Sequence, residues 1–181
     1  MRLFLAVDLP QSVKNELDQQ LRALKKEYAF FNWVPPENYH ITLHFFGERN
    51  DVDKIKQKIE EAVFDINSFN LYAWNASLFM QNNILLYISF RREKKMEEIA
   101  ERINKSFQGG DEKKFIAHLT IARARIPSKQ QYLNLKKKLL QLPIEIEFAV
   151  NKIHLFQSII EGKRPSYKKI SGFSLMKQHQ S

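Results

Sequence analysis

The tripeptide His-x-Thr occurs twice in this chain, each time within an apolar run rich in residues that favour β-strands. The first copy begins at His40 and places Thr42 two positions later; the second begins at His118 and places Thr120 likewise. Because successive side chains of a strand point to opposite faces, each histidine shares a face with its threonine. The sequence therefore predicts two strands that each present an imidazole and a hydroxyl on one side, and these groups suit acid/base chemistry on a phosphate.

The order helix, His-x-Thr strand, helix, strand, strand also occurs twice. Apolar residues recur at helical spacing around each motif, and runs of β-formers follow. The predicted strands cover 2–8, 30–34, 39–46, 70–79, 84–90, 115–122, 144–150, 152–159 and 167–173, and the predicted helices cover 10–24, 51–63, 96–107 and 128–139. Turn or boundary signals stand at 81–83, Gly109-Gly110 and Pro127-Ser128. A duplicated α+β pattern without a linker favours two similar lobes in one body over two tethered domains. Pseudo-symmetry between such lobes would bring both histidines to a shared cleft.

Composition narrows the classes of function. The 181 residues contain no cysteine, which excludes disulfides, thiolate zinc sites and a cysteine nucleophile. No stretch approaches the ~20 apolar residues of a membrane span and no signal segment opens the chain, so we expect a cytoplasmic protein without a membrane partner. The net charge of +9 is consistent with a nucleic-acid partner or with a lysine-rich solubilising surface.

Metal binding is the rival use of the motif histidines. His40 and His44 are four residues apart, which on a helix would bring two ligands together. On a strand the same spacing spans about 13 Å, too far for both to bind one ion. The alternation of Ile41, Leu43 and Phe45 with the polar residues favours the strand, and neither motif core contains an acidic residue. We therefore expect neither a metal nor a cofactor.

Other residues near the motifs are candidates for substrate contacts. Arg123 follows Thr120 at the end of the second motif strand, where its guanidinium could reach a phosphate, although a surface arginine is a fair alternative. His44 continues the polar face of the first motif, with an exposed strand-end histidine as the alternative. Phe4 and Tyr167 could stack on a base, but most aromatic residues in this chain are expected in the core.

These residues resemble the 2H phosphoesterase superfamily, which is named for its paired His-x-Thr motifs. Within it the chain is most similar to the bacterial and archaeal RNA 2′,3′-cyclic phosphodiesterases, historically called 2′-5′ RNA ligases. The resemblance covers nearly the whole chain. Besides the motifs it rests on the segments 2–7, 33–40, 45–48 and 115–123, on Ser158, and on Pro165-Ser166-Tyr167. Family members usually have Pro where this chain has Ala117, Arg or Lys in place of His44, and Gly in place of Arg164; these departures bear on substrate preference more than on activity.

The resemblance implies a single bilobal domain over 1–181, of α+β class, with two pseudo-symmetric lobes. Each lobe would be an antiparallel sheet with helices on its outer side, and the motifs would lie on central strands facing an active-site cleft between the sheets. His40 and His118 would be the acid/base pair, with Thr42, Thr120 and Arg123 binding the phosphate. The implied reaction opens the 2′,3′-cyclic phosphate of an RNA end to a 2′-phosphate, and related members join or cleave 2′-5′ linkages without ATP or metal. We expect a monomer.

Two alternatives remain open. The first is an RNA-binding module without catalysis, which the charge and the aromatic residues would fit. The second is a phosphodiesterase of the same superfamily that acts on a small cyclic nucleotide, because the motifs bind the phosphate and not the base. Which histidine is the base and which the acid is also open.

Overall fold

The computed structural model describes residues 1–80, 82–107, 114–125, 128–162 and 164–178. The predicted signals at Gln81, Gly109-Gly110 and Pro127 lie outside these ranges. In chain order the elements are β1 (Arg2–Asp8), α1 (Gln11–Gln20), α2 (Arg22–Glu27), β2 (Asn32–Trp33), η1 (Pro36–Asn38), β3 (His40–Glu48), α3 (Val52–Val63), β4 (Phe69–Met80), β5 (Ile84–Phe90), α4 (Lys94–Phe107), β6 (His118–Ala124), α5 (Lys129–Gln141), β7 (Ile146–Val150), β8 (Lys152–Glu161) and β9 (Arg164–Ser174).

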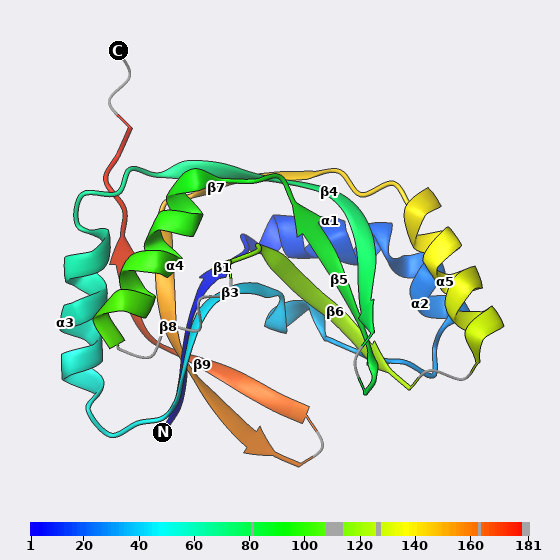
Figure 1. Cartoon of the computed structure of the whole chain (residues 1–181), viewed down its shortest axis with the longest axis horizontal. Helices are drawn as coiled ribbons and strands as arrows, with labels where there is room; N and C mark the ends of the chain where they lie inside the picture. The colour runs from blue at the N-terminus through cyan, green and yellow to red at the C-terminus, as the bar shows by residue number, and fades with distance from the viewer. Residues whose placement is uncertain (81, 108–113, 126–127, 163, 179–181) are drawn as a thin grey trace.

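The strands form two antiparallel sheets, one in the order β3-β1-β8-β9 (sheet A) and one in the order β2-β6-β5-β4-β7 (sheet B). Helices α3 and α4 pack on sheet A, and α1 and α5 pack on sheet B, as Figure 1 shows. The predicted α+β class with two sheets and outer helices is confirmed. The lobes are not consecutive halves of the chain, however, because β8 and β9 return to the sheet of β1 and β3.

The two motif strands, β3 of sheet A and β6 of sheet B, contact each other in the middle of the molecule. The expectation of central strands was wrong for sheet A, where β3 is an edge strand. In sheet B only the two-residue strand β2 lies beyond β6. Strands β3 and β6 belong to different sheets, so this arrangement brings the two motifs together by packing of one sheet against the other.

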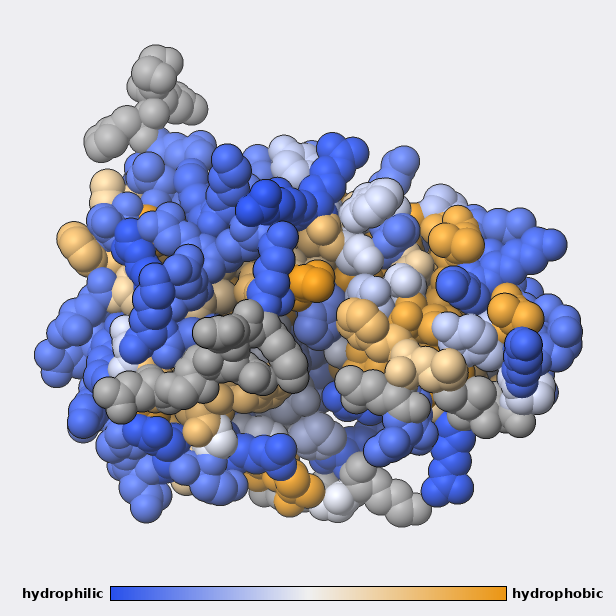
Figure 2. Space-filling model, in the orientation of Figure 1, coloured by the Kyte–Doolittle hydropathy of each residue, from blue (hydrophilic) through white to orange (hydrophobic). Residues whose placement is uncertain are grey.

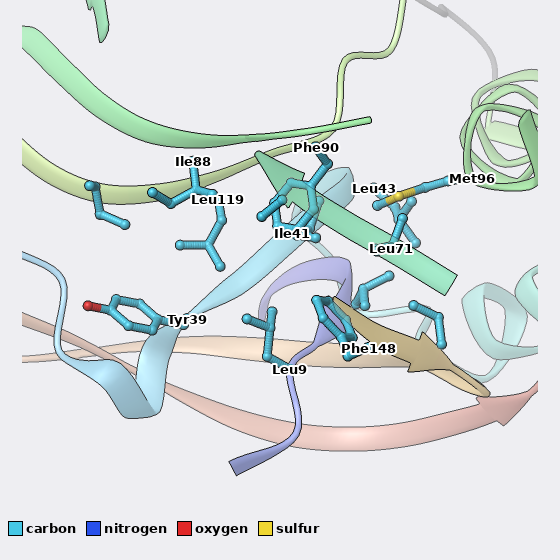
Figure 3. Packing of buried hydrophobic residues seen from close by; sticks show 14 of the residues in the cluster. Leu9, Tyr39, Ile41, Leu43, Leu71, Ile88, Phe90, Met96, Leu119 and Phe148 are labelled. Carbon is cyan, nitrogen blue, oxygen red and sulfur yellow. The ribbon is translucent and has the colours of Figure 1, made fainter. Parts of the chain in front are cut away.

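The residue between each histidine and threonine enters the core, as predicted. Ile41 and Leu119 are both fully buried, and Figure 3 shows them close together, with Ile88 of β5 near Leu119. Full burial of such a side chain stabilises the fold by roughly 1.5–3 kcal/mol. One apolar cluster joins both sheets and their helices, so the core fixes how the motif strands sit relative to each other.

The starts of two helices differ in their capping. Asp51 comes directly before α3, but its carboxylate pairs with Arg49 and does not cap the helix. Ser128 does cap α5, accepting a hydrogen bond from the backbone N–H of Gln131. In the described ranges, no helix combines the length and the apolar character that crossing a membrane requires.

Candidate active site

The first motif faces the cleft side of sheet A. His40 and Thr42 lie opposite Asp8 and Ala6 of β1, whose side chains point away from the core residues Leu5 and Val7. The pairing then shifts by one residue, since His44 lies opposite Leu5 and Leu43 is left without a partner. An extra residue of this kind is a β-bulge, and it reverses the faces of the side chains that follow it, up to a second shift in the pairing at Phe46.

The bulge turns His44 away from the cleft, so the expectation that His44 shares the polar face of the motif was wrong. Its Nδ1 lies 2.6 Å from Oδ1 of Asn104 in α4, and its ring stacks on Phe107. Burial lowers the pKa of His44, and the hydrogen bond with Asn104 opposes this. His44 therefore attaches helix α4 to sheet A.

The same bulge brings Phe45 to the cleft face, opposite Phe4, where it is 71% exposed. The strict alternation assumed from the sequence had assigned Phe45 to the core. An exposed phenylalanine beside the first motif offers a surface on which a ribose or base can pack.

The second motif repeats this geometry in sheet B. His118 and Thr120 lie opposite Ser89 and Tyr87 of β5, and a shift then leaves Ile121 unpaired. Without a bulge, Arg123 would point to the opposite face from Thr120, three residues earlier. The bulge instead places Arg123 on the cleft side, opposite Leu85, in an exposed position.

The two bulges make Phe45 and Arg123 equivalent positions of the two lobes. Each stands three residues after its motif threonine, just beyond an unpaired residue. One lobe thus contributes an aromatic ring and the other a guanidinium to the shared cleft. In Figure 2 the surface is hollowed near the middle of the view, between the lobe with α3 and α4 and the lobe with α5.

Both imidazoles are oriented by the same backbone contact. Nδ1 of His40 is 2.7 Å from the carbonyl oxygen of Asn38, and Nδ1 of His118 is 2.9 Å from that of Ile116. A carbonyl accepts only, so Nδ1 carries the hydrogen in each ring, and in the neutral ring Nε2 is left as the proton acceptor. In each ring Nε2 is therefore the nitrogen left to exchange a proton with a ligand.

The surroundings of the two rings differ. His40 packs against Phe4 and Tyr167 at ring-centroid distances of 5.0 and 5.1 Å. Burial lowers the pKa of His40; the carbonyl of Asn38 and the Asp8 carboxylate oppose this, while Lys14 and His118 add to it. The contribution of His118 to this pKa reflects the short span between the two motifs.

His118 packs edge-on against a stacked aromatic pair of sheet B. Phe79 and Tyr87 lie 4.3 Å apart with nearly parallel rings, and each meets the His118 ring almost at a right angle. Neither aromatic residue was a candidate from the sequence. Period-two alternation of β5, with Ile84, Leu86 and Ile88 buried, would have placed Tyr87 on the motif side.

The two aromatic residues that were candidates for stacking on a base, Phe4 and Tyr167, differ in how far they are buried. Phe4 is only 3% exposed, because Phe156, Tyr167 and His40 surround it, so the expectation that it stacks on a base is wrong and it supports the His40 ring instead. Tyr167 stays half-buried beside His40. Burial raises the pKa of Tyr167, and the positive charges of Arg123 and Arg2 oppose this.

A charged cluster behind His40 was missed from the sequence. Asp8 accepts from Lys14 at 2.7 Å and from Lys169 at 2.6 Å, and Lys14 is 6% exposed. Burial alone would raise the pKa of Asp8, but the hydrogen bonds from the two lysines outweigh it and the pKa is lowered. An ionised Asp8 next to His40 favours the protonated imidazole.

Comparisons with known proteins find relatives of one kind. The model of the family described as LigT like Phosphoesterase matches residues 7–85, which include the first motif. Curated relatives named RNA 2′,3′-cyclic phosphodiesterase include one from Methanocaldococcus jannaschii, 29% identical over 94% of this chain and 98% of its own length. Another, from Thermotoga maritima, is 27% identical over 93% and 92%.

Solved structures show the same fold. The crystal structure of Escherichia coli LigT complexed with 3′-AMP aligns with a TM-score of 0.75 over 96% of this chain and 97% of that one, at 18% identity. TT0787 of Thermus thermophilus aligns with a TM-score of 0.73 over 99% and 100%, at 24% identity. The resemblance to the 2H phosphoesterases is confirmed by the family model and by the curated relatives, and the solved structures share the fold.

Proposed function

We propose that this protein hydrolyses the 2′,3′-cyclic phosphate of RNA ends to a 2′-phosphate, without a metal, using His40 and His118 as acid and base. One observation carries the proposal: two imidazoles, each oriented by the carbonyl two residues before it, offer Nε2 to one cleft. The relatives named RNA 2′,3′-cyclic phosphodiesterase support the choice of substrate. ATP-independent 2′-5′ ligation would be the same ring opening, with an RNA 5′-hydroxyl in place of water as the nucleophile.

The reaction needs two proton transfers in the same cleft. One Nε2 takes a proton from water as its oxygen attacks the phosphorus, and the P–O3′ bond breaks. The Nε2–H of the other imidazole protonates the departing O3′. Each role typically contributes ~10²–10⁴ in rate. Thr42, Thr120 and Arg123 donate hydrogen bonds to the phosphoryl oxygens, where negative charge grows in the transition state.

We assign the base to His40 and the acid to His118. Burial lowers the pKa of His40, which therefore starts neutral at neutral pH. The hydrogen bond that orients His118 is exposed, whereas that of His40 is partly buried. Water accommodates a positive charge better than the aromatic surroundings of His40 do. The role of His118 as the acid follows from this contrast.

The test uses an oligonucleotide that ends in a 2′,3′-cyclic phosphate, incubated with the protein in EDTA. We expect a 2′-phosphate product, and a loss of at least a hundredfold in kcat/KM for His40→Ala and for His118→Ala, with unchanged circular dichroism. Near-wild-type turnover by either variant would refute the two-histidine mechanism. Salt-sensitive RNA binding without product would instead favour a non-catalytic RNA-binding module, and turnover of small cyclic nucleotides alone would favour a different substrate. The single domain over 1–181, the monomer and the cytoplasmic location remain predictions.

A further inference from the structure

A second hollow lies directly before the second motif strand. Its volume is about 190 Å³, and its walls come from the end of β5, the first turn of α4 and the segment 114–117 that leads into His118. Small-molecule sites usually enclose ~300–1,000 Å³, so this hollow suits one phosphoryl or ribose unit better than a whole nucleotide.

The hollow lies on the same side of sheet B as the side chain of His118. Ser89 lies opposite His118, and Arg91 continues the alternation of β5 by donating its N–H to the carbonyl of Tyr72 at 2.8 Å. Arg91 therefore points to the same side as Ser89 and His118. Two residues of strand span about 7 Å, which is within the reach of one nucleotide step from the scissile phosphate.

The charges around the hollow leave Arg91 as a donor for a ligand. Arg92 forms a two-pronged ion pair with Glu97 at 2.8 Å, and Glu93 accepts the backbone N–H of Lys95 at the start of α4. Within the ranges that the structure describes, no carboxylate oxygen lies within 4.0 Å of the Arg91 guanidinium. Lys114 adds a further positive charge to the wall.

Exposed aromatic rings continue this surface along β4. The Arg91 guanidinium lies over the ring of Tyr72, 5.7 Å from its centroid. Trp74, which a bulge between Ala73 and Asn75 leaves unpaired, is 58% exposed. A basic group flanked by exposed aromatic rings is the usual composition of a single-stranded nucleic-acid site, where phosphates meet cations and bases stack.

We propose that this hollow binds the phosphodiester immediately 5′ to the cyclic phosphate, through Arg91 and Lys114, with Tyr72 and Trp74 as the platform for the preceding base. The inference rests on the proposed function and extends it: the substrate is an RNA strand and not a free mononucleotide. A phosphodiester carries one negative charge on a small group, which matches both the size and the charge of the hollow.

The test compares two substrates with the same terminal nucleoside, a 2′,3′-cyclic mononucleotide and an oligonucleotide with that end. The measured quantity is the ratio of kcat/KM for the oligonucleotide to that for the mononucleotide. Arg91→Ala is expected to lower this ratio about tenfold. Arg22→Ala, which removes the same charge from an exposed position on α2, is expected to leave it unchanged. Arg91→Gln keeps most of the side-chain stem and serves if the alanine variant is destabilised. An unchanged ratio in the Arg91 variants would overturn the proposal.

A binding measurement separates this proposal from the proposed function. If the wild-type protein turns over neither substrate, the proposed function fails, and the affinity for single-stranded RNA is then measured against salt. Loss of one phosphate contact lowers the slope of log K against log salt by ~0.7. A lower slope for Arg91→Ala, but not for Arg22→Ala, would support binding of a phosphodiester in the hollow. Equal slopes for both variants would reject it.

Discussion

The ion pair between Asp8 and Lys14 should dominate the stability of the region behind His40. Both groups are largely buried, with side-chain exposures of 15% and 7%, and Lys14 also donates to the carbonyl of Glu37 at 3.0 Å. Asp8→Asn leaves the Lys14 charge buried without its counter-ion, a change that costs about 3–5 kcal/mol in free energy of unfolding. With a slope of ~1–3 kcal/mol per M in urea, the unfolding midpoint should fall by about 1 M or more.

Two further variants test the cause. Lys169→Ala removes the other partner of Asp8, but this lysine is half exposed, so the expected loss is below about 1 kcal/mol. Lys14→Met combined with Asp8→Asn removes both buried charges, and should be less destabilised than Asp8→Asn alone. If Asp8→Asn costs no more than Lys169→Ala, the argument from burial is wrong.

The pH dependence of this loss has a definite sign. The pKa of Asp8 is lowered in the folded state, so its ionised form stabilises the protein above the unfolded value near 3.8. That stabilisation is lost as the pH falls through the folded-state pKa. The difference in unfolding free energy between the wild type and Asp8→Asn should therefore be full near pH 7 and shrink in acid.

Three other results are expected. The profile of kcat/KM against pH should be bell-shaped, with its acid limb below 6.5 because burial lowers the pKa of His40; a profile flat from pH 5 to 9 would contradict acid/base catalysis. Phe45→Ala should raise KM for a cyclic-phosphate RNA several-fold, with a smaller change in kcat, whereas Phe64→Ala, an equally exposed residue at the end of α3, should change neither. His44→Ala should lower the thermal midpoint by removing the contact with Asn104, while kcat/KM stays within about twofold; a large loss of activity would place His44 at the substrate after all.

Strand alternation predicted the faces of the motif residues but not those of the residues beyond each motif. It correctly placed His40 with Thr42 and Ile41 in the core, because that stretch of β3 pairs regularly with β1. Beyond Thr42 the faces depend on a bulge, and a bulge exists only as a mismatch with the partner strand. The local sequence of β3 therefore does not predict the bulge. His44 was accordingly assigned to the wrong face and Phe45 was overlooked.

Long-range pairings limited the prediction of the fold in the same way. The repeated order of elements indicated two lobes, but which strands share a sheet depends on pairings such as β1 with β8, more than a hundred residues apart. The Asp8–Lys14 pair is close in sequence, yet its burial is decided by β9 and by η1, which cover it. The pattern of charged residues in the sequence predicted neither the contact with β9 nor the contact with η1.

Which histidine acts as base and which as acid depends on the differences between the two otherwise similar lobes. Both histidines have the same backbone partner and both motifs the same bulge, so the repeated geometry alone would let either imidazole act as base. The differences lie around them. Burial lowers the pKa of His40, and the bulge of the first motif presents Phe45, whereas the bulge of the second motif presents Arg123. The phosphoryl charge is then drawn toward sheet B while the ribose and base pack on sheet A. Exchanging the two side chains, Phe45→Arg with Arg123→Phe, should therefore lower kcat/KM by far more than Phe45→Ala does, although the composition of the cleft is unchanged.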